Sequence, residues 1–203
     1  MNGIKFRPLC IHINHLNFLF GGFMSKKIQL NILLILLSLL ILDFIVIKLT
    51  TIPQDTLIMQ HRLEQILNTP IHLLELKAYG NRQYLTYLNP QSSHIDLAIY
   101  HKNKLLPTRY NLEEIRAASS QALISPCQFY QTDTTLVIWG ENSNLSAKSM
   151  IIKIGHEVFI EDLTQSKNFL YIYAISIHTP CSLKFLGPNG EDLTSSFLSV
   201  KIP

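Results

Sequence analysis

The sequence predicts an α+β protein in which an N-terminal transmembrane helix precedes a helix plus β-meander unit and a C-terminal β-sandwich-like unit. Three observations lead to this prediction. Residues 28–47 are almost wholly apolar (IQLNILLILLSLLILDFIVI). A short segment after Pro53 repeats apolar residues at helical spacing, and most of the remaining chain alternates at the period of a β-strand. We expect five segments: a leader or tail at 1–23, a membrane anchor at 24–49, the helix and meander at 50–110, a helical connector at 111–130, and a β-rich unit at 131–203.

The apolar segment has the length of a membrane span. Twenty helical residues cover about 30 Å, which is the thickness of the hydrocarbon part of a bilayer. From Ile32 to Leu42 the only polar residue is Ser38, whose hydroxyl can bond to a carbonyl one turn earlier. A helix in the core of a soluble domain usually carries a polar stripe, which this segment lacks. We therefore expect contact with membrane lipid.

Basic residues on the N-terminal side predict the orientation. Lys26 and Lys27 precede the segment, and Lys5 and Arg7 lie further upstream. An excess of basic residues marks the cytoplasmic side, so the C-terminal domain should be extracytoplasmic. The apolar run is longer than that of a simple signal peptide, and no small-residue cleavage pattern follows it. These features predict an uncleaved signal-anchor in the cell membrane.

Two polar residues of the segment are candidates for docking on a partner helix. Ser38 lies near its centre, and Asp43 lies closer to the outer end. An ionisable residue inside a membrane often has a functional role. Asp43 can instead lie at the outer interface and reach water or Lys48, so both interpretations stay open.

The first 23 residues resemble a translated leader. They show no helical or strand period, and Met24 is followed by Ser-Lys-Lys, a normal start for a bacterial membrane protein. Gly21-Gly22-Phe23 is what a purine-rich ribosome-binding site would give if it were translated in frame. We expect Met24 rather than Met1 to be the start, with a short cytoplasmic tail as the alternative.

The charge of the exterior part argues against nucleic acid as a partner. The chain has a formal charge of +3, but twelve basic and thirteen acidic residues follow Leu49. A nucleic-acid-binding domain would carry a basic patch or run, and none is present in this sequence. The expected partners are membrane lipid and another envelope or membrane protein.

Two cysteines follow the membrane segment, Cys127 and Cys181. An external location permits a disulfide between them, which would stabilise the fold by roughly 3–4.7 kcal/mol. Two buried free thiols are the alternative. Two cysteines alone cannot form a zinc site, and we expect no cofactor or metal.

Segment 50–130 begins with a helix. Asp55 can cap it, Met59 and Leu63 recur on one face, and Asn68 ends it. Three alternating runs then predict a β-meander, with strands near 74–78, 84–88 and 95–99. The run Asn111-Leu-Glu-Glu114 has the spacing of a capping box, which predicts a connecting helix toward Leu123.

Segment 131–203 has β patterns throughout. The run from Phe169 to Ile177 is apolar on both faces, so we expect a central strand that is buried on both sides. Gly187-Pro-Asn-Gly190 predicts a turn. The short strands suggest a sandwich, with an immunoglobulin-like order as one possibility. They are expected near 136–139, 150–154, 158–160, 169–177, 183–185 and 197–200.

The layout from Ile28 to Thr194 is similar to that of uncharacterised single-pass envelope proteins of Gram-positive bacteria. The similarity rests on the order of anchor, helix, meander and connector, followed by three sequence features. These are the strand ending in Val137-Ile-Trp-Gly140, the strand Lys167–Tyr173, and the turn Phe185-Leu-Gly-Pro-Asn-Gly-Glu191. The resemblance implies a location and an architecture, and it implies no activity.

No motif for a specific reaction occurs in the sequence. The chain is therefore expected to act by binding or assembly and not as an enzyme. One alternative is an envelope hydrolase with dispersed groups such as Glu75, His94 and Asp96. A second alternative is an accessory subunit that docks through Ser38 or Asp43.

Overall fold

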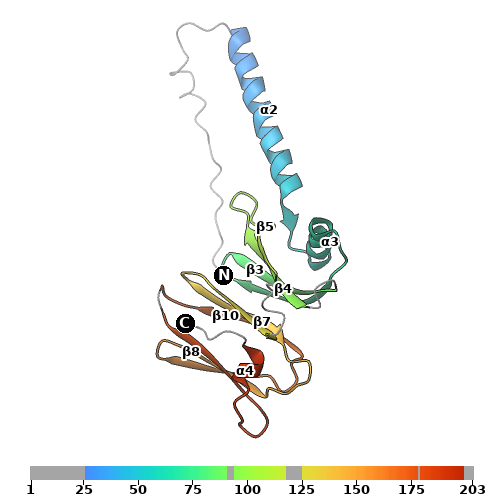
Figure 1. The fold of residues 1–203 in the computed structure, drawn as a ribbon. Helices are drawn as coiled ribbons and strands as arrows, with labels where there is room; N and C mark the ends of the chain where they lie inside the picture. Colours follow the sequence, from blue (N-terminus) through green and yellow to red (C-terminus); the bar gives the residue numbers. More distant parts are fainter. Residues whose placement is uncertain (1–25, 91–93, 118–124, 178, 199–203) are drawn as a thin grey trace, which may run out of the picture. The chain divides into compact units, whose positions relative to one another are not determined.

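The structure is a computed structural model that describes residues 26–90, 94–117, 125–177 and 179–198 (Figure 1). The chain divides into two compact units, Met1–Leu49 and Thr50–Pro203. The predicted leader at 1–23, and with it the choice between Met1 and Met24, lies outside the described residues.

The apolar segment forms one uninterrupted helix, α2, from Lys26 to Thr50. Its large apolar side chains are exposed all around the helix, for example Leu33 at 59% and Leu40 at 66%. Ser38 Oγ donates to the carbonyl oxygen of Ile35 at 2.7 Å, as predicted. Within the described part of the chain, α2 is the one helix with the length and composition of a membrane span or a signal sequence.

The second unit begins with a five-stranded antiparallel sheet and a helix on one face of it (Figure 1). The predicted meander is confirmed as β2, β3 and β4, and β1 and β5 extend it in the order β1-β5-β4-β3-β2. The elements are β1 (Ile52–Pro53), α3 (Thr56–Leu67), β2 (His72–Tyr79), β3 (Arg82–Asn89), β4 (His94–Lys102) and β5 (Arg109–Arg116).

Helix α3 has the predicted caps. The carboxylate of Asp55 accepts hydrogen bonds from the backbone N–H groups of Leu57 and Ile58 at 2.9 and 3.2 Å. Asn68 ends the helix with a φ of 52°, a left-handed conformation that asparagine tolerates better than most residues. Local sequence signals were sufficient to place this helix.

The predicted helical connector is wrong. Residues 109–116 form strand β5, residues 127–131 form another strand, and 118–124 lie outside the described residues. Glu114, which would complete the capping box, instead forms an ion pair with Arg116 at 2.6 Å. Glu113 forms an ion pair with Arg82, also at 2.6 Å. Pairing with β4 buries more surface than an isolated helical turn could, and this overrides the local signal.

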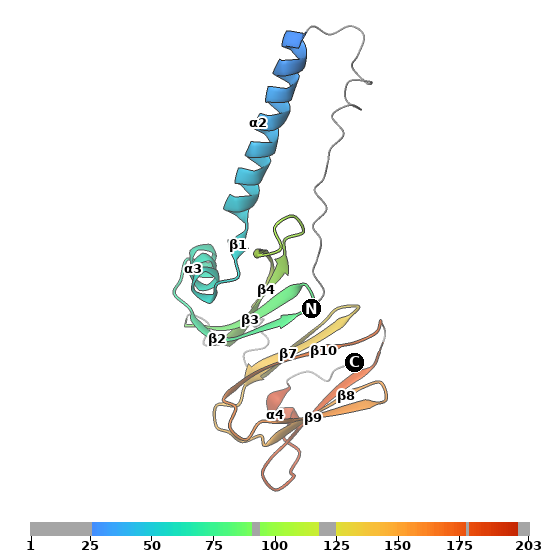
Figure 2. The same cartoon turned by 180° about the vertical axis from the view of Figure 1, so that it is seen from behind.

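The C-terminal part contains two three-stranded antiparallel sheets (Figure 2). We call them the β7 sheet, ordered β10-β7-β6, and the β8 sheet, ordered β11-β8-β9. Their strands are β6 (Cys127–Gln131), β7 (Thr135–Glu141), β8 (Ser149–Ile154), β9 (Glu157–Asp162), β10 (Asn168–Ala174) and β11 (Cys181–Leu186).

Two predictions for this part need correction. A last strand was expected near 197–200, but Phe197 ends a short helix, α4 (Thr194–Phe197). The ring of Phe197 stacks on that of Phe185, with 4.3 Å between the ring centroids. Residues 199 and 200 lie outside the described part. The strand expected to be central, β10, lies at the edge of its sheet. It is nevertheless buried on both faces at Phe169 and Leu170, as predicted.

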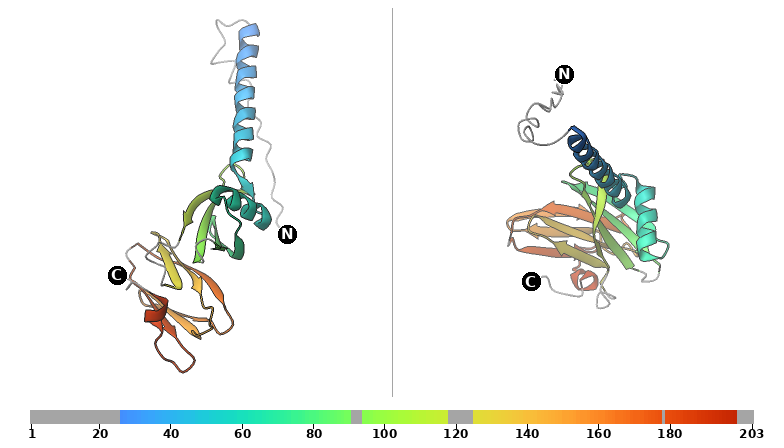
Figure 3. Two further views of the ribbon diagram at one scale, coloured as in Figure 1. Left: turned by 45° about the vertical axis from the view of Figure 1, so that its right-hand side comes forward. Right: turned by 90° about the horizontal axis from the view of Figure 1, so that it is seen from above.

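Figure 3 shows the sheets of the second unit from two further sides. Three hydrophobic clusters form its core. The first lies between α3 and the five-stranded sheet, the second between that sheet and the β7 sheet, and the third draws on the β7 and β8 sheets. Strand β7 divides its side chains between two clusters: Val137 and Trp139 belong to the second, and Leu136 and Ile138 to the third. The sandwich class and its immunoglobulin-like order stay predictions.

The predicted disulfide is absent from the structure. Cys127 and Cys181 are both free and buried, and both belong to the third cluster. Cys127 opens β6, opposite Gly140 of β7, whereas Cys181 opens β11, opposite Ile154 of β8. The alternative of two buried free thiols therefore describes the structure.

Candidate functional site: a groove beside the five-stranded sheet

The joint between the five-stranded sheet and the β7 sheet positions the candidate site. At its centre the indole N–H of Trp139 donates to the carbonyl oxygen of Ile95 at 2.9 Å, and both residues are buried. The bond ties β7 to the start of β4. Burial of both partners makes it costly to break, because the carbonyl would lose its donor without gaining water.

A cation lies over a tyrosine ring at each margin of this joint. The ammonium of Lys77 lies 4.9 Å from the ring centroid of Tyr171, and the guanidinium of Arg116 lies 4.2 Å from that of Tyr130. Lys77 also donates to the carbonyl oxygen of Leu170. Burial raises the pKa of Tyr171 to about 12, so its ring stays neutral at physiological pH. Each contact contributes about 0.5–2 kcal/mol to the packing of the β7 sheet on the five-stranded sheet.

A groove of about 310 Å³ opens at one end of the joint. A β-bulge between Leu73 and Glu75 gives β2 an extra residue, Leu74, which lines the groove and packs against the second cluster. This volume is at the low end for ligand pockets. The groove combines an apolar floor with polar side chains, and its lining is Leu74, Leu88, Ile95, Glu141, Ser143, Lys167 and Asn168.

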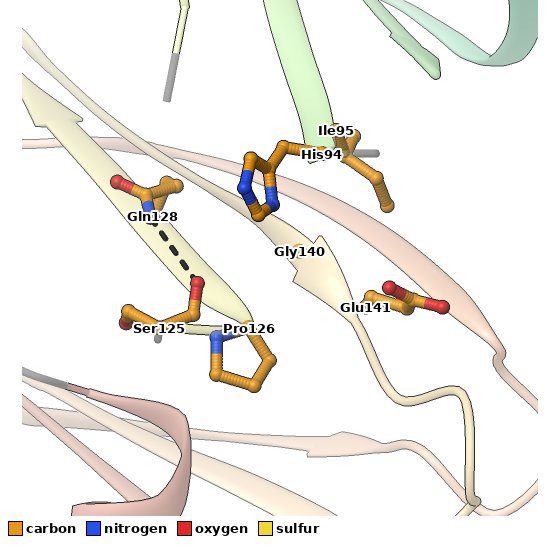
Figure 4. A pocket seen from close by; sticks show the side chains of 7 residues that line it. All are labelled: His94, Ile95, Ser125, Pro126, Gln128, Gly140 and Glu141. Carbon is orange, nitrogen blue, oxygen red and sulfur yellow. Dashed lines mark hydrogen bonds between the residues drawn. The ribbon is translucent and has the colours of Figure 1, made fainter. Parts of the chain in front are cut away.

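A smaller pocket of about 30 Å³ adjoins the groove and shares Ile95 and Glu141 with it. Figure 4 shows all seven of its lining residues, and the dashed line there is the bond from Gln128 Nε2 to the carbonyl oxygen of Ser125, at 3.3 Å. The space suits about one water molecule. The remaining lining residues are His94, Pro126 and Gly140.

The small pocket contains a serine and a histidine, Ser125 and His94. Ser125 Oγ lies 2.7 Å from the carbonyl oxygen of Phe197 and 2.8 Å from that of Cys127, so its hydroxyl connects two segments of the backbone. Gly140 is required for packing, because a Cβ there would lie 2.3 Å from the carbonyl oxygen of Pro126.

The residues considered for a hydrolase do not converge. Glu75 pairs with Thr86, which pairs with Leu97 of the second cluster, so Glu75 lies on the β7 side of the five-stranded sheet. Asp96 pairs with Tyr87 of the first cluster and lies on the opposite face. His94 lines the small pocket. A sheet therefore separates the two carboxylates.

The remaining predicted site residues are dispersed. Ser38 and Asp43 are exposed on α2. Burial raises the pKa of both Cys127 and Cys181, which keeps the thiols protonated and unreactive. Within the described ranges, no three His, Cys, Asp or Glu side chains lie close enough together to hold a metal ion.

The groove residues were not predicted from the sequence. Glu141, Lys167 and Asn168 lie at strand ends, where polar residues are common and carry no signal. The one usable hint is the pair of adjacent apolar residues Leu73 and Leu74, which breaks the alternation at the bulge.

No protein-family model, curated protein or solved structure matches this chain. The similarity to envelope proteins therefore stays a prediction. In chemical terms, the groove offers apolar contact together with one carboxylate, one ammonium and one amide. Such a lining suits recognition of a ligand or a peptide segment.

Proposed function

We propose that this chain is a single-pass membrane-anchored protein whose extracytoplasmic domain acts by binding or assembly, and not by catalysis. The observation that carries the proposal is α2. It is apolar on every side, and in the described structure nothing buries it. An apolar surface of this extent is stable in lipid but not in water.

The structure just after α2 supports an uncleaved anchor over a removable signal sequence. Only Thr51 separates the last residue of α2 from β1, and its side chain is 2% exposed. Arg109 Nε donates to Thr51 Oγ1 at 2.6 Å, and Ile52 pairs with Tyr110 of β5. The segment where a signal peptidase would cut is therefore part of the folded sheet.

The groove supports a binding role for the domain. Its apolar and charged lining residues come from the two sheets and the loops next to β7 and β10, and the Trp139 bond and the two cation–π contacts hold these sheets together. A sandwich-like arrangement of the β7 and β8 sheets is supported by the third cluster, which contains side chains from both of these sheets. A hydrolase using Glu75, His94 and Asp96 has less support, since the sheet separates its carboxylates.

Labelling of intact cells with a membrane-impermeant maleimide tests the topology. The native Cys127 and Cys181 are buried, so a new surface thiol gives the signal. We expect Asp133→Cys to react in intact cells and the matched variant Lys27→Cys to react only after lysis. The opposite labelling pattern would invert the topology. Mass spectrometry of a mature chain that lacks residues 26–50 would show α2 to be a signal sequence.

Asp43 favours a second candidate function, that of an accessory subunit. It places a carboxylate on an otherwise apolar face of α2, where a polar group of a partner helix could satisfy it. We expect Asp43→Asn and Ser38→Ala to reduce recovery of a membrane complex on native gels, with Leu40→Val as the matched control. Equal recovery of all variants would leave α2 as a plain anchor.

A further inference from the structure

Strand β9, Glu157–Asp162, is an open sheet edge. It is the last strand of the β8 sheet and, within the described residues, its backbone pairs on one side only, with β8 (Figure 2). The other side of such a strand presents N–H and C=O groups that can pair with another chain. The strand contains no proline, no lysine and no bulge, and its charged side chains are the carboxylates Glu157, Glu161 and Asp162.

Some other edges of the second unit are partly covered by the chain itself. Beside β11, Leu193 N–H donates to the carbonyl oxygen of Phe185 at 2.8 Å, and Leu186 forms a bridge with Asp192. Strand β1 covers the start of β5, and Lys77 donates to the Leu170 carbonyl oxygen of β10. Within the described residues, β9 has no comparable contact on its free side, and β2 and β6 also pair on one side only.

The two faces of β9 differ in chemistry. On the outer face Val158 and Ile160 are 57% and 69% exposed, and Ile160 lies opposite Ile151 of β8. On the inner face Glu157 and Glu161 flank Phe159. Tyr173 donates to Glu161 at 2.5 Å, which fixes that carboxylate beside the edge.

A second copy of this chain would oppose like charges in one register of the edge. In an antiparallel pair of two β9 strands, the register that sets Val158 against Ile160 also sets Glu157 against Glu161. Directly opposed like charges destabilise a strand pair. The carboxylates therefore disfavour that register and favour a partner of the opposite charge.

We propose that β9 receives an extended segment of another protein, in which apolar residues alternate with basic residues. The apolar residues would lie beside Val158 and Ile160, and the basic residues beside Glu157 and Glu161. Main-chain hydrogen bonds provide the affinity in this mode of recognition, and the alternating side chains provide the specificity. The inference deepens the proposed function and rests on it for the role of the domain in binding.

Binding of synthetic peptides to the full-length chain in detergent micelles tests this inference. The probe is a fluorescent peptide, TKVKVKT, which presents valine on one face and lysine on the other. The comparison peptides are TEVEVET, with the charge reversed, and a form of the probe that is N-methylated at alternate residues on the pairing edge. We expect the probe to bind, and both comparison peptides to bind about tenfold more weakly or not at all.

Variants of the chain locate the binding to β9. Glu157→Lys should weaken binding of the probe by about three- to tenfold, and the double variant Val158→Ser and Ile160→Ser by a similar factor. The matched controls are two substitutions outside β9. Asp133→Lys makes the same charge change in the turn between β6 and β7, and Ile177→Ser removes an apolar side chain that is 57% exposed. Both controls should bind as the unaltered chain does. Amide hydrogen exchange should show protection of β9 by the probe.

Three results would overturn the inference: no binding of the probe, equal binding of the N-methylated form, or equal loss with Asp133→Lys and Glu157→Lys. The last result would indicate general electrostatic attraction. The measurement is made in detergent, so it does not depend on the orientation of α2 in cells. Failure of the labelling experiment and failure of this one are therefore distinguishable.

Discussion

The first and third hydrophobic clusters differ in the kind of side chain that they bury. The cluster under α3 contains three tyrosines, Tyr87, Tyr100 and Tyr110, and the same sheet buries the carboxylate of Asp96. The third cluster is formed mainly by aliphatic side chains and phenylalanines, with Phe169, Phe185 and Phe197 in ring contact. One core buries several polar groups, and the other depends on apolar packing.

This difference predicts which kind of substitution should destabilise each half of the second unit. A buried hydroxyl or carboxylate is costly unless it has a hydrogen-bond partner, so the first core should respond to loss or gain of single polar atoms. A packed apolar core should respond to lost volume. The joint at Trp139 connects the two halves and should decide whether they unfold together.

The largest effect is expected from Phe185→Ala in the third cluster. The substitution removes the stack on Phe197, whose ring centroid is 4.3 Å away, and leaves a cavity. We expect the free energy of unfolding to fall by about 3–5 kcal/mol, as measured by chemical denaturation. Ile160→Val, at an exposed position, is the control and should change it by less than about 0.5 kcal/mol. A small effect of Phe185→Ala would contradict a packed third cluster.

Trp139→Phe should weaken the joint between the halves. It keeps most of the ring but removes the N–H that Ile95 accepts, which should cost about 1–3 kcal/mol. Calorimetry should show one transition for the unaltered domain and a broadened or split transition for the variant. Tyr79→Phe removes a hydroxyl from an exposed strand end and should leave the transition unchanged. A split transition in the unaltered domain would show that the joint does not couple the halves.

Two matched variants test the polar core. Among the described residues, Tyr87 Oη has no hydrogen-bond partner, whereas Tyr100 Oη lies 3.4 Å from the carbonyl oxygen of Met59. Tyr87→Phe should therefore stabilise the fold by up to about 1 kcal/mol, and Tyr100→Phe should destabilise it by about 0.5–1.5 kcal/mol. Denaturation of both variants at neutral pH measures this. Effects of equal sign would contradict the assigned roles.

The smallest effect concerns Glu113, which Arg82 contacts through two hydrogen bonds of 2.6 and 2.8 Å. These bonds lower the pKa of Glu113 below its usual value. A lowered folded-state pKa contributes stability above the unfolded value of about 4.3, and that stability is lost as the pH falls through the folded value. Glu113→Gln should cost about 0.2–1 kcal/mol at neutral pH, because the pair is partly exposed.

The control for Glu113→Gln is the pH dependence itself. Below the folded-state pKa the carboxyl is protonated in both states, so the difference between the variant and the unaltered chain should disappear as the pH falls through that pKa. A difference that stays constant as the pH falls would show that the substitution acts through β5 packing and not through charge. Asp133→Asn, on the β6–β7 turn, should show no comparable change.

The sequence was most informative where neighbours in the chain decide the structure. The apolar run from Ile28 to Ile47, the caps of α3 at Asp55 and Asn68, and the β-meander could all be predicted. The turn at Gly187–Gly190 also follows from local sequence, and Gly190 adopts a φ of +81°. Each of these signals acts over a few residues, so a single sequence contains it completely.

The candidate site could not be predicted in this way. The groove lies between residues of β2 and β3, such as Leu74 and Leu88, and residues near β10, such as Lys167. The open edge of β9 exists only because β11 and β9 flank β8. Both features depend on which strands become neighbours.

By itself, the sequence determined an apolar helix with the length of a membrane span or signal sequence, followed by a β-rich domain. Only the tertiary structure decided that Asn111–Glu114 would join a sheet, that Cys127 and Cys181 would stay apart as thiols, and that β9 would lie at the edge of its sheet. The physical reason is that strand pairing and burial connect residues far apart in the chain, and their free energy exceeds that of the local capping signal.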